Sequence, residues 1–177
     1  MRCHLLLTLP VLLAATPVLQ NPPQQAAQPL RPAVAITGAK SAVEKAAYHR
    51  LRSAQDLARI WLQHLGKQPP AGEYGFYYNE AAVPEIDFER FEVVAIFGGS
   101  GWNSAGFAVE SVGDEKDART IRFDDKSYQT EGPNGGGKRV SPFGFFVLPR
   151  TELPIVLQQN VQSMIGEPPQ WQERARL

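Results

Sequence analysis

The fold is decided by residues 93–109, VVAIFGGSGWNSAGFAV, in which an apolar strand runs into a glycine-rich corner carrying Trp102 and then into a second strand. Nucleotide-binding folds place phosphates in a glycine-rich loop that opens a helix, whereas this chain continues as β. No Gly-Lys-Ser or Gly-Lys-Thr follows the corner, and no glycine stands two residues after Ser100, so the corner is neither a P-loop nor a nucleophile elbow. The stretch therefore favours a β scaffold whose loops contact a partner over a nucleotide enzyme.

Further strands are expected on both sides of this corner. Val93–Phe97 is an unbroken apolar run rich in β-branched residues, which is typical of a central strand buried on both faces. Phe107–Val112 follows the corner, and we expect it to pair with Val93–Phe97. Alternating or apolar patterns predict other strands at Tyr48–Arg52, Thr120–Phe123, Val140–Leu148 and Pro154–Gln159. The short connections favour antiparallel pairing, because parallel strands need crossover helices that the pattern lacks.

One amphipathic helix is predicted, from Ala54 to Leu65. Ser53 is a suitable N-cap whose side chain can accept from the amide of Asp56, and Gly66 provides the stop. The apolar face has the 3.6-residue spacing of a helix and consists of Leu57, Ile60, Trp61, His64 and Leu65. The predicted fold class is therefore α+β, with one N-terminal amphipathic helix packed on a mostly antiparallel β-sheet of about five strands.

The N-terminus has the pattern of a secretory signal peptide. Arg2 supplies a positive charge, and Leu5–Ala15 is an apolar core that is too short and too interrupted to span a membrane. We therefore expect a signal peptide at 1–19, a polar leader rich in Pro and Gln at 20–40, an α+β domain at 41–165 and a tail at 166–177. We also expect a secreted or periplasmic protein with no stable membrane span after signal cleavage.

Composition argues against several function classes. Lysine plus arginine and aspartate plus glutamate number 18 each, so no net charge attracts nucleic acid. Cys3, the single cysteine, precedes the apolar core of the signal, so the mature chain is expected to lack disulfides and cysteine-ligated metal. His49 reads as a surface residue, and His64 as a buried histidine with a backbone partner rather than a catalytic base. We expect no cofactor and no catalysis. A calcium site is a less favoured alternative to solvated turns for the acidic residues Glu85, Asp87, Glu89, Asp124 and Asp125.

The candidate partner-binding residues lie at the glycine-rich corner and in the loop around Gly132–Gly137. An exposed tryptophan at a loop tip is typical of a binding hot spot, but Trp102 could equally pack as a lid on the sheet. The aromatic cluster Tyr74–Tyr78 allows the same two interpretations. The two loops together nominate Gly99, Gly101, Trp102, Asn103, Phe107, Gly136 and Lys138.

Several short motifs resemble the C-terminal domain of the protease-complex subunit PrcB family. They occur in order across residues 42–158 and comprise Asp87-Phe88, Val93–Gly98, Gly106-Phe107, Ser141-Pro142-Phe143 and Val147–Arg150. The resemblance implies an extracytoplasmic bacterial domain that helps a surface protease complex to assemble or stay stable, and it implies no enzyme activity. The corner departs from the family pattern, because this chain reads Ser104-Ala105 before Gly106 and inserts Trp102-Asn103. The identity of the partner is therefore not carried over.

The sequence thus leads to three functional hypotheses of different classes. We expect an exported, non-catalytic protein-binding module that assists the assembly or stability of an extracytoplasmic protease complex. The alternative is an inhibitor of an extracytoplasmic protease that inserts its glycine-rich loops into a cleft. A small hydrolase is the least favoured, because no nucleophile and base are assembled in the motifs.

Overall fold

The computed structural model describes residues 30–67, 81–130, 135–162, 164 and 166–177. Its elements follow the chain as β1 Val34–Gly38, β2 Ala46–Leu51, α1 Ala54–His64, β3 Phe91–Gly98, β4 Gly101–Trp102, β5 Ser104–Asp114, β6 Arg119–Ser127, β7 Arg139–Val140, β8 Phe143–Pro149, β9 Ile155–Asn160 and β10 Trp171–Arg176. The predicted signal peptide and the aromatic cluster Tyr74–Tyr78 lie outside the described residues.

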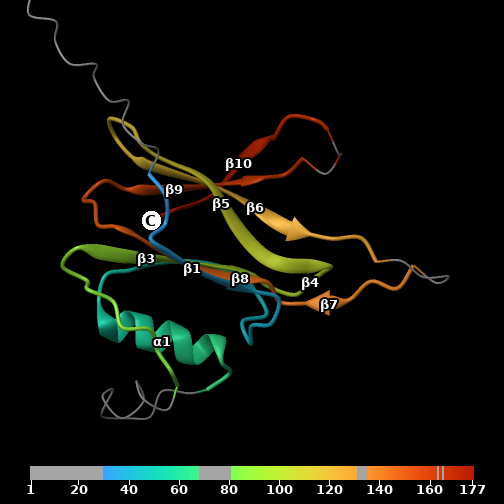
Figure 1. Cartoon of the computed structure of the whole chain (residues 1–177), viewed down its shortest axis with the longest axis horizontal. Helices are drawn as coiled ribbons and strands as arrows, with labels where there is room; N and C mark the ends of the chain where they lie inside the picture. Colours follow the sequence, from blue (N-terminus) through green and yellow to red (C-terminus); the bar gives the residue numbers. More distant parts are fainter. Residues whose placement is uncertain (1–29, 68–80, 131–134, 163, 165) are drawn as a thin grey trace, which may run out of the picture.

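The described elements form three layers (Figure 1). Helix α1 covers one face of a four-stranded sheet of order β1-β8-β3-β2, and the other face packs on a second four-stranded sheet of order β10-β9-β6-β5. β4 and β7 form a separate two-stranded pair. Every pair is antiparallel except β6 with β9. The predicted α+β class with mostly antiparallel pairing is confirmed, but the single sheet is wrong, and α1 follows β1 and β2 rather than opening the fold.

Local signals account for α1. The Ser53 side chain accepts a hydrogen bond from the amide of Asp56 at 3.1 Å, as the N-cap pattern predicts. Leu57, Ile60 and His64 are buried, and Trp61 packs against the same core. Leu65 is 41% exposed, contrary to the prediction, because it is the C-cap beyond the last helical turn. The helix instead buries Ala58 and Leu62.

β3 lies between two separate hydrophobic cores, which explains its unbroken apolar run. Alternate side chains of a strand point to opposite faces of the sheet. Val93, Ala95 and Phe97 pack in the core beneath α1, whereas Val94 and Ile96 pack in the core between the two sheets. The prediction of a central strand buried on both faces is confirmed.

The glycine-rich corner carries the chain from one sheet to the other, so the predicted pairing of Phe107–Val112 with β3 is wrong. Both edges of β3 are taken, by β2 and by β8, and β5 pairs with β6 instead. Gly99 turns the chain with a φ of +74°, and Gly106 has a φ of +112° where β5 passes β1. A Cβ at Gly106 would lie 2.7 Å from the Gly38 nitrogen, so only glycine allows the two edge strands to approach here.

Two strands lie outside the range 41–165 that the sequence suggested for the folded domain. β1, within the predicted leader, pairs with β8 along its whole length. β10, within the predicted tail, pairs with β9 and completes the second sheet. β1 is rich in β-branched residues but directly follows the segment rich in Pro and Gln, and β10 is mostly polar, so the sequence analysis predicted neither strand.

Candidate functional site

The β4–β7 pair holds Trp102 at one end of the molecule (Figure 1). Trp102 is 58% exposed, so it does not pack as a lid on the sheet, which was one of the two alternatives that the sequence left open. The Arg139 guanidinium lies 5.2 Å from the centroid of the indole ring. Gly137 lies close against the same ring, since a Cβ there would be 3.0 Å from the indole Cε3. The ring is thus exposed but held by its own neighbours.

Hydrogen bonds fix the backbone beside Trp102. Asn103 has a φ of +52°, a conformation that asparagine tolerates better than most residues. Its side-chain oxygen accepts from the Lys138 amide at 2.7 Å, and its own amide donates to the Lys138 carbonyl at 2.9 Å. Arg139 Nε donates to Ser100 Oγ at 3.1 Å. These bonds tie the two glycine-rich segments together, and we call residues 99–103 and 135–139 the Trp102 arm.

Five of the seven nominated residues lie in exposed or half-buried positions of the Trp102 arm, namely Gly101, Trp102, Asn103, Gly136 and Lys138. Phe107 does not belong to this surface. It is 3% exposed and packs edge-on against Phe123 in the core between the sheets, because β5 turns that position inward. Gly99 is also buried, and a Cβ there would lie 2.9 Å from the Ala46 nitrogen, so its role is to let the corner pack on β2.

A pocket of about 290 Å³ opens beside Trp102 at the end of the inter-sheet space. Its apolar wall includes Phe107 and Pro142. Its polar wall consists of Tyr48, Ser104, Asp125, Gln159 and Arg174. Ser104 Oγ donates to Asp125, and Arg174 Nε donates to Gln159 Oε1 at 2.9 Å. The nominated residues Gly101, Trp102 and Phe107 line this pocket. The sequence did not predict the polar wall as a unit, because its residues come from strands far apart in the chain.

Two groups in this pocket have shifted acidities. Burial raises the pKa of Asp125; the Ser104 hydrogen bond opposes this shift and the neighbouring Asp124 adds to it. Burial also raises the pKa of the Tyr48 phenol, against the opposing positive charge of Arg174. The Tyr48 phenol therefore keeps its proton and can donate a hydrogen bond, and the Asp125 carboxyl group has less water around it than that of a surface residue.

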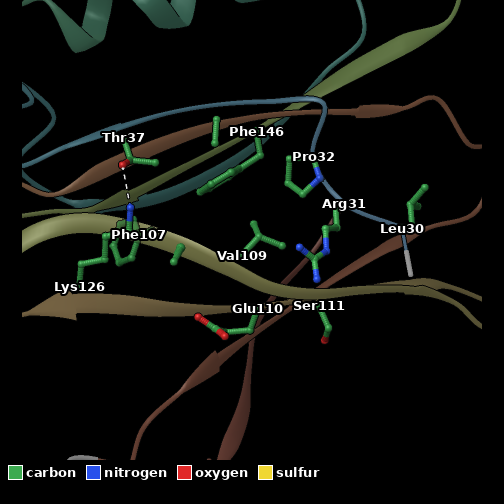
Figure 2. Close-up of a pocket in the computed structure, with 12 residues that line it drawn as sticks. Leu30, Arg31, Pro32, Thr37, Phe107, Val109, Glu110, Ser111, Lys126 and Phe146 are labelled. Carbon is green, nitrogen blue, oxygen red and sulfur yellow. Dashed lines mark hydrogen bonds between the residues drawn. The ribbon is translucent and has the colours of Figure 1, made fainter. Parts of the chain in front are cut away.

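A second, larger hollow of about 460 Å³ lies between the edge strands β1 and β5 (Figure 2). The strands meet at Gly38 and Gly106 at one end, and Leu30 bridges to Val112 at the other. Lys126 Nζ reaches across to the Thr37 hydroxyl at 3.4 Å. This hollow is distinct from the Trp102 arm, and nothing in the described part of the chain indicates what would occupy it.

Glu92 is the most deeply buried charge, and the sequence analysis did not single it out. Its side chain is fully buried, and Arg50 Nε lies 2.8 Å from Glu92 Oε2. Arg52 Nε is 3.2 Å from the same oxygen, and Arg119 from the other sheet is 3.8 Å from Oε1. Arg119 also pairs with Asp114 at 2.6 Å, and this partner lowers the pKa of Asp114. A glutamate beginning an apolar strand is the one signal that could have drawn attention to this cluster.

His64 is a core residue, as the sequence predicted. Its side chain is 7% exposed and its ring centroid is 4.0 Å from that of Phe143. Its partner is the Ser41 hydroxyl, at 3.1 Å from Nδ1, and not the predicted backbone group. Burial lowers the pKa of His64. His49 is half-buried with its ring near Phe97, so the prediction of a surface residue is wrong.

Acidification should destabilise the fold through His64. A histidine whose folded pKa is lowered stabilises the fold fully above its unfolded pKa, and this contribution falls as the pH drops through about 6.5. We therefore expect the thermal midpoint to fall more steeply below neutral pH in the wild type than in His64→Gln, measured by circular dichroism. The pH dependence of the midpoint that remains in the variant includes the titration of His49, whose pKa is lowered by burial and by the charge of Arg59. Parallel profiles for the two proteins would contradict the assignment.

No family model, no curated protein and no solved structure matches this chain. Within the described residues, no three His, Cys, Asp or Glu side chains gather as a metal site would require. The one described helix, α1, is not long and apolar enough to cross a membrane.

Proposed function

We propose that this chain is an exported, non-catalytic protein-binding module that engages its partner with the Trp102 arm. The observation that carries the proposal is the position of Trp102, which is 58% exposed yet held by Arg139 and Gly137. Tryptophan is strongly enriched at interface hot spots, and a side chain already held in place loses less entropy when it binds. The resemblance of this chain to the PrcB C-terminal domain supports a component of an extracytoplasmic protease complex as the class of partner.

Trp102→Ala should abolish partner capture without lowering stability. The ring lies outside both hydrophobic cores, so we expect the thermal midpoint to change by less than about 2 °C, the shift that corresponds to a few tenths of a kcal/mol. The measurement is crosslinking of the tagged full-length chain in the cells that make it, followed by affinity purification and mass spectrometry. A partner recovered equally with wild type and Trp102→Ala would contradict the proposal.

Trp171→Ala is the matched control for that experiment. Trp171 is also partly exposed, and it also has a guanidinium over its ring, that of Arg122 at 5.5 Å from the centroid. It lies on β10 and does not belong to the Trp102 arm. We expect this variant to capture the partner as the wild type does, so a general effect of removing a surface tryptophan is separated from a local one.

A proteolysis assay distinguishes assembly from inhibition once the partner protease is in hand. The inhibitor alternative rests on the exposed segment 135–139, which lies beside Trp102 and could enter a cleft. An inhibitor suppresses cleavage at stoichiometric amounts, whereas an assembly subunit leaves cleavage unchanged or raises it. We expect no suppression.

A further inference from the structure

The pocket beside Trp102 is built from polar residues at positions where the sandwich would otherwise be apolar. Along β6, Ile121 and Phe123 point into the inter-sheet core, and the next residue of that alternation is Asp125. Along β9, Leu157 points into the same core and is followed in the alternation by Gln159. Polar side chains at core-facing positions weaken packing and usually mark a site with another use.

The polar groups of this pocket leave specific hydrogen-bonding capacity for a ligand. Arg174 forms no ion pair in the described part of the chain, and only its Nε is engaged, by Gln159. Gln159 uses its oxygen in that bond, which leaves its amide nitrogen as a donor. Tyr48 adds a protonated phenol, and Asp125 has one oxygen that is not bonded to Ser104. The pocket thus offers several donors beside one carboxylate acceptor.

We propose that this pocket binds a carboxylate that carries a neighbouring N–H group, as at the C-terminal residue of a polypeptide. The ligand carboxylate pairs with Arg174 and accepts from Tyr48 and Gln159, the adjacent N–H donates to Asp125, and the side chain lies against Phe107 and Pro142. A guanidinium is well suited to a carboxylate because it donates two parallel hydrogen bonds. If the carboxylate belongs to the C-terminus of the partner protein, the inference rests on the proposed function. Trp102 borders the pocket, so the partner's last residue would lie beside it.

Charge and size support this ligand over a cationic side chain. Arg174 borders the pocket and the Arg139 guanidinium lies over Trp102, and neither forms an ion pair within the described residues. A lysine or arginine side chain in the pocket would be repelled by the positive charge of Arg174, which lines the pocket together with Asp125. The volume of about 290 Å³ is at the lower end of the range for ligand pockets, and it suits one amino-acid residue rather than a longer segment.

The test uses the indole N–H signals of the protein, observed by ¹H–¹⁵N correlation spectroscopy. The chain has three tryptophans, so three indole signals report on three places, and Trp102→Phe assigns the one of interest. We titrate the full chain with N-acetyl-L-leucine, which has the carboxylate and the N–H, and with N-acetyl-L-leucine amide, which lacks the carboxylate. The acid should shift the Trp102 signal in a saturable way. The amide should cause no saturable shift of the same signal. Absence of a saturable Trp102 shift with the acid overturns the proposal.

Arg174→Gln tests the residue assigned to the carboxylate. We expect the affinity for N-acetyl-L-leucine to fall at least about tenfold, the effect of losing a charge-assisted hydrogen bond. The matched control is Arg176→Gln, which removes a charge from the same strand, where Arg176 pairs with Glu173 at 3.3 Å outside the pocket. Equal affinities for Arg174→Gln and wild type would overturn carboxylate recognition by Arg174.

Free L-leucine separates the two sources of this chemistry. Its α-ammonium would meet Asp125, so binding at least as tight as that of N-acetyl-L-leucine assigns the site to free amino acids, and weaker binding assigns it to a polypeptide C-terminus. The outcome is independent of the capture experiment. If neither probe binds but Trp102→Ala still abolishes capture, the proposed function stands and this inference fails.

Discussion

Replacing Glu92 with alanine should lower the free energy of unfolding by about 3 to 5 kcal/mol, because three guanidinium groups would lose a buried carboxylate partner. Arg119 and Arg52 would keep Asp114 and Glu152, whereas Arg50 forms no other ion pair in the described part of the chain. Arg50 and Arg119 are nearly buried, with side-chain exposures of 13% and 4%, so water cannot replace the lost partner. Arg50 lies on β2, in the sheet that α1 covers, and Arg119 lies on β6, in the other sheet. Glu92 thus connects two sheets that share no strand.

Urea denaturation followed by circular dichroism measures this effect as a fall in the midpoint concentration at constant slope. Glu152→Ala is the matched control, since Glu152 also pairs with Arg52, at 3.3 Å, but its side chain is 81% exposed. Surface pairs contribute about 0 to 1 kcal/mol, so the control should change little. Equal effects of the two substitutions would mean that Glu92 is not buried among the arginines as described.

The elements that the sequence predicted well are those set by neighbours along the chain. Ser53 caps α1, and the spacing of Leu57 and Ile60 identified the buried face. The apolar run of β3 was sufficient to predict burial on both faces. These patterns depend on geometry that repeats every two or 3.6 residues, so a short segment contains the whole signal.

Pairing partners could not be predicted in the same way. A strand pattern says that Phe107 lies in a strand, but not that both edges of β3 are already occupied and that the corner crosses to a second sheet. β10 has a weak β-branched and aromatic signal, and β1 is only five residues long, so neither was predicted as a strand; their pairing depends on β8 and β9. The sequence analysis therefore predicted one sheet where the structure has two four-stranded sheets, because a sequence pattern does not show these long-range contacts.

The candidate site divides along the same line. The sequence nominated Trp102 because its glycine neighbours leave little to bury it, and the structure shows that Trp102 is exposed. Four other nominated residues lie in exposed or half-buried positions of the Trp102 arm. Phe107 was nominated together with the loop, but it is 3% exposed and reaches the site only as part of the pocket wall. The sequence singled out Asp125 only for the less favoured calcium site, and it did not single out Gln159 or Arg174. These three pocket residues come together only when β6, β9 and β10 form the second sheet.

Trp61→Ala should destabilise the protein by about 3 to 5 kcal/mol, the usual effect of removing a large aromatic side chain from a packed interface. The Trp61 ring centroid lies 5.0 Å from that of Phe145 on β8, and its indole N–H donates to the Ala81 carbonyl at 2.9 Å. The side chain therefore joins α1 both to the sheet and to the segment that precedes β3. Losing it removes apolar contact and leaves the Ala81 carbonyl without this donor.

Trp61→Phe separates the two contributions. Phenylalanine keeps most of the contact with Phe145 but cannot donate to Ala81, so we expect a loss of about 1 to 2 kcal/mol, from one hydrogen bond and a small change in volume. Both variants are measured by urea denaturation beside the wild type. A loss below about 1 kcal/mol for Trp61→Ala would contradict packing of α1 on the sheet. Losses that small are typical of surface substitutions that remove no packed contact. The expected order, alanine well below phenylalanine and phenylalanine below wild type, follows only if the ring lies between the helix and β8.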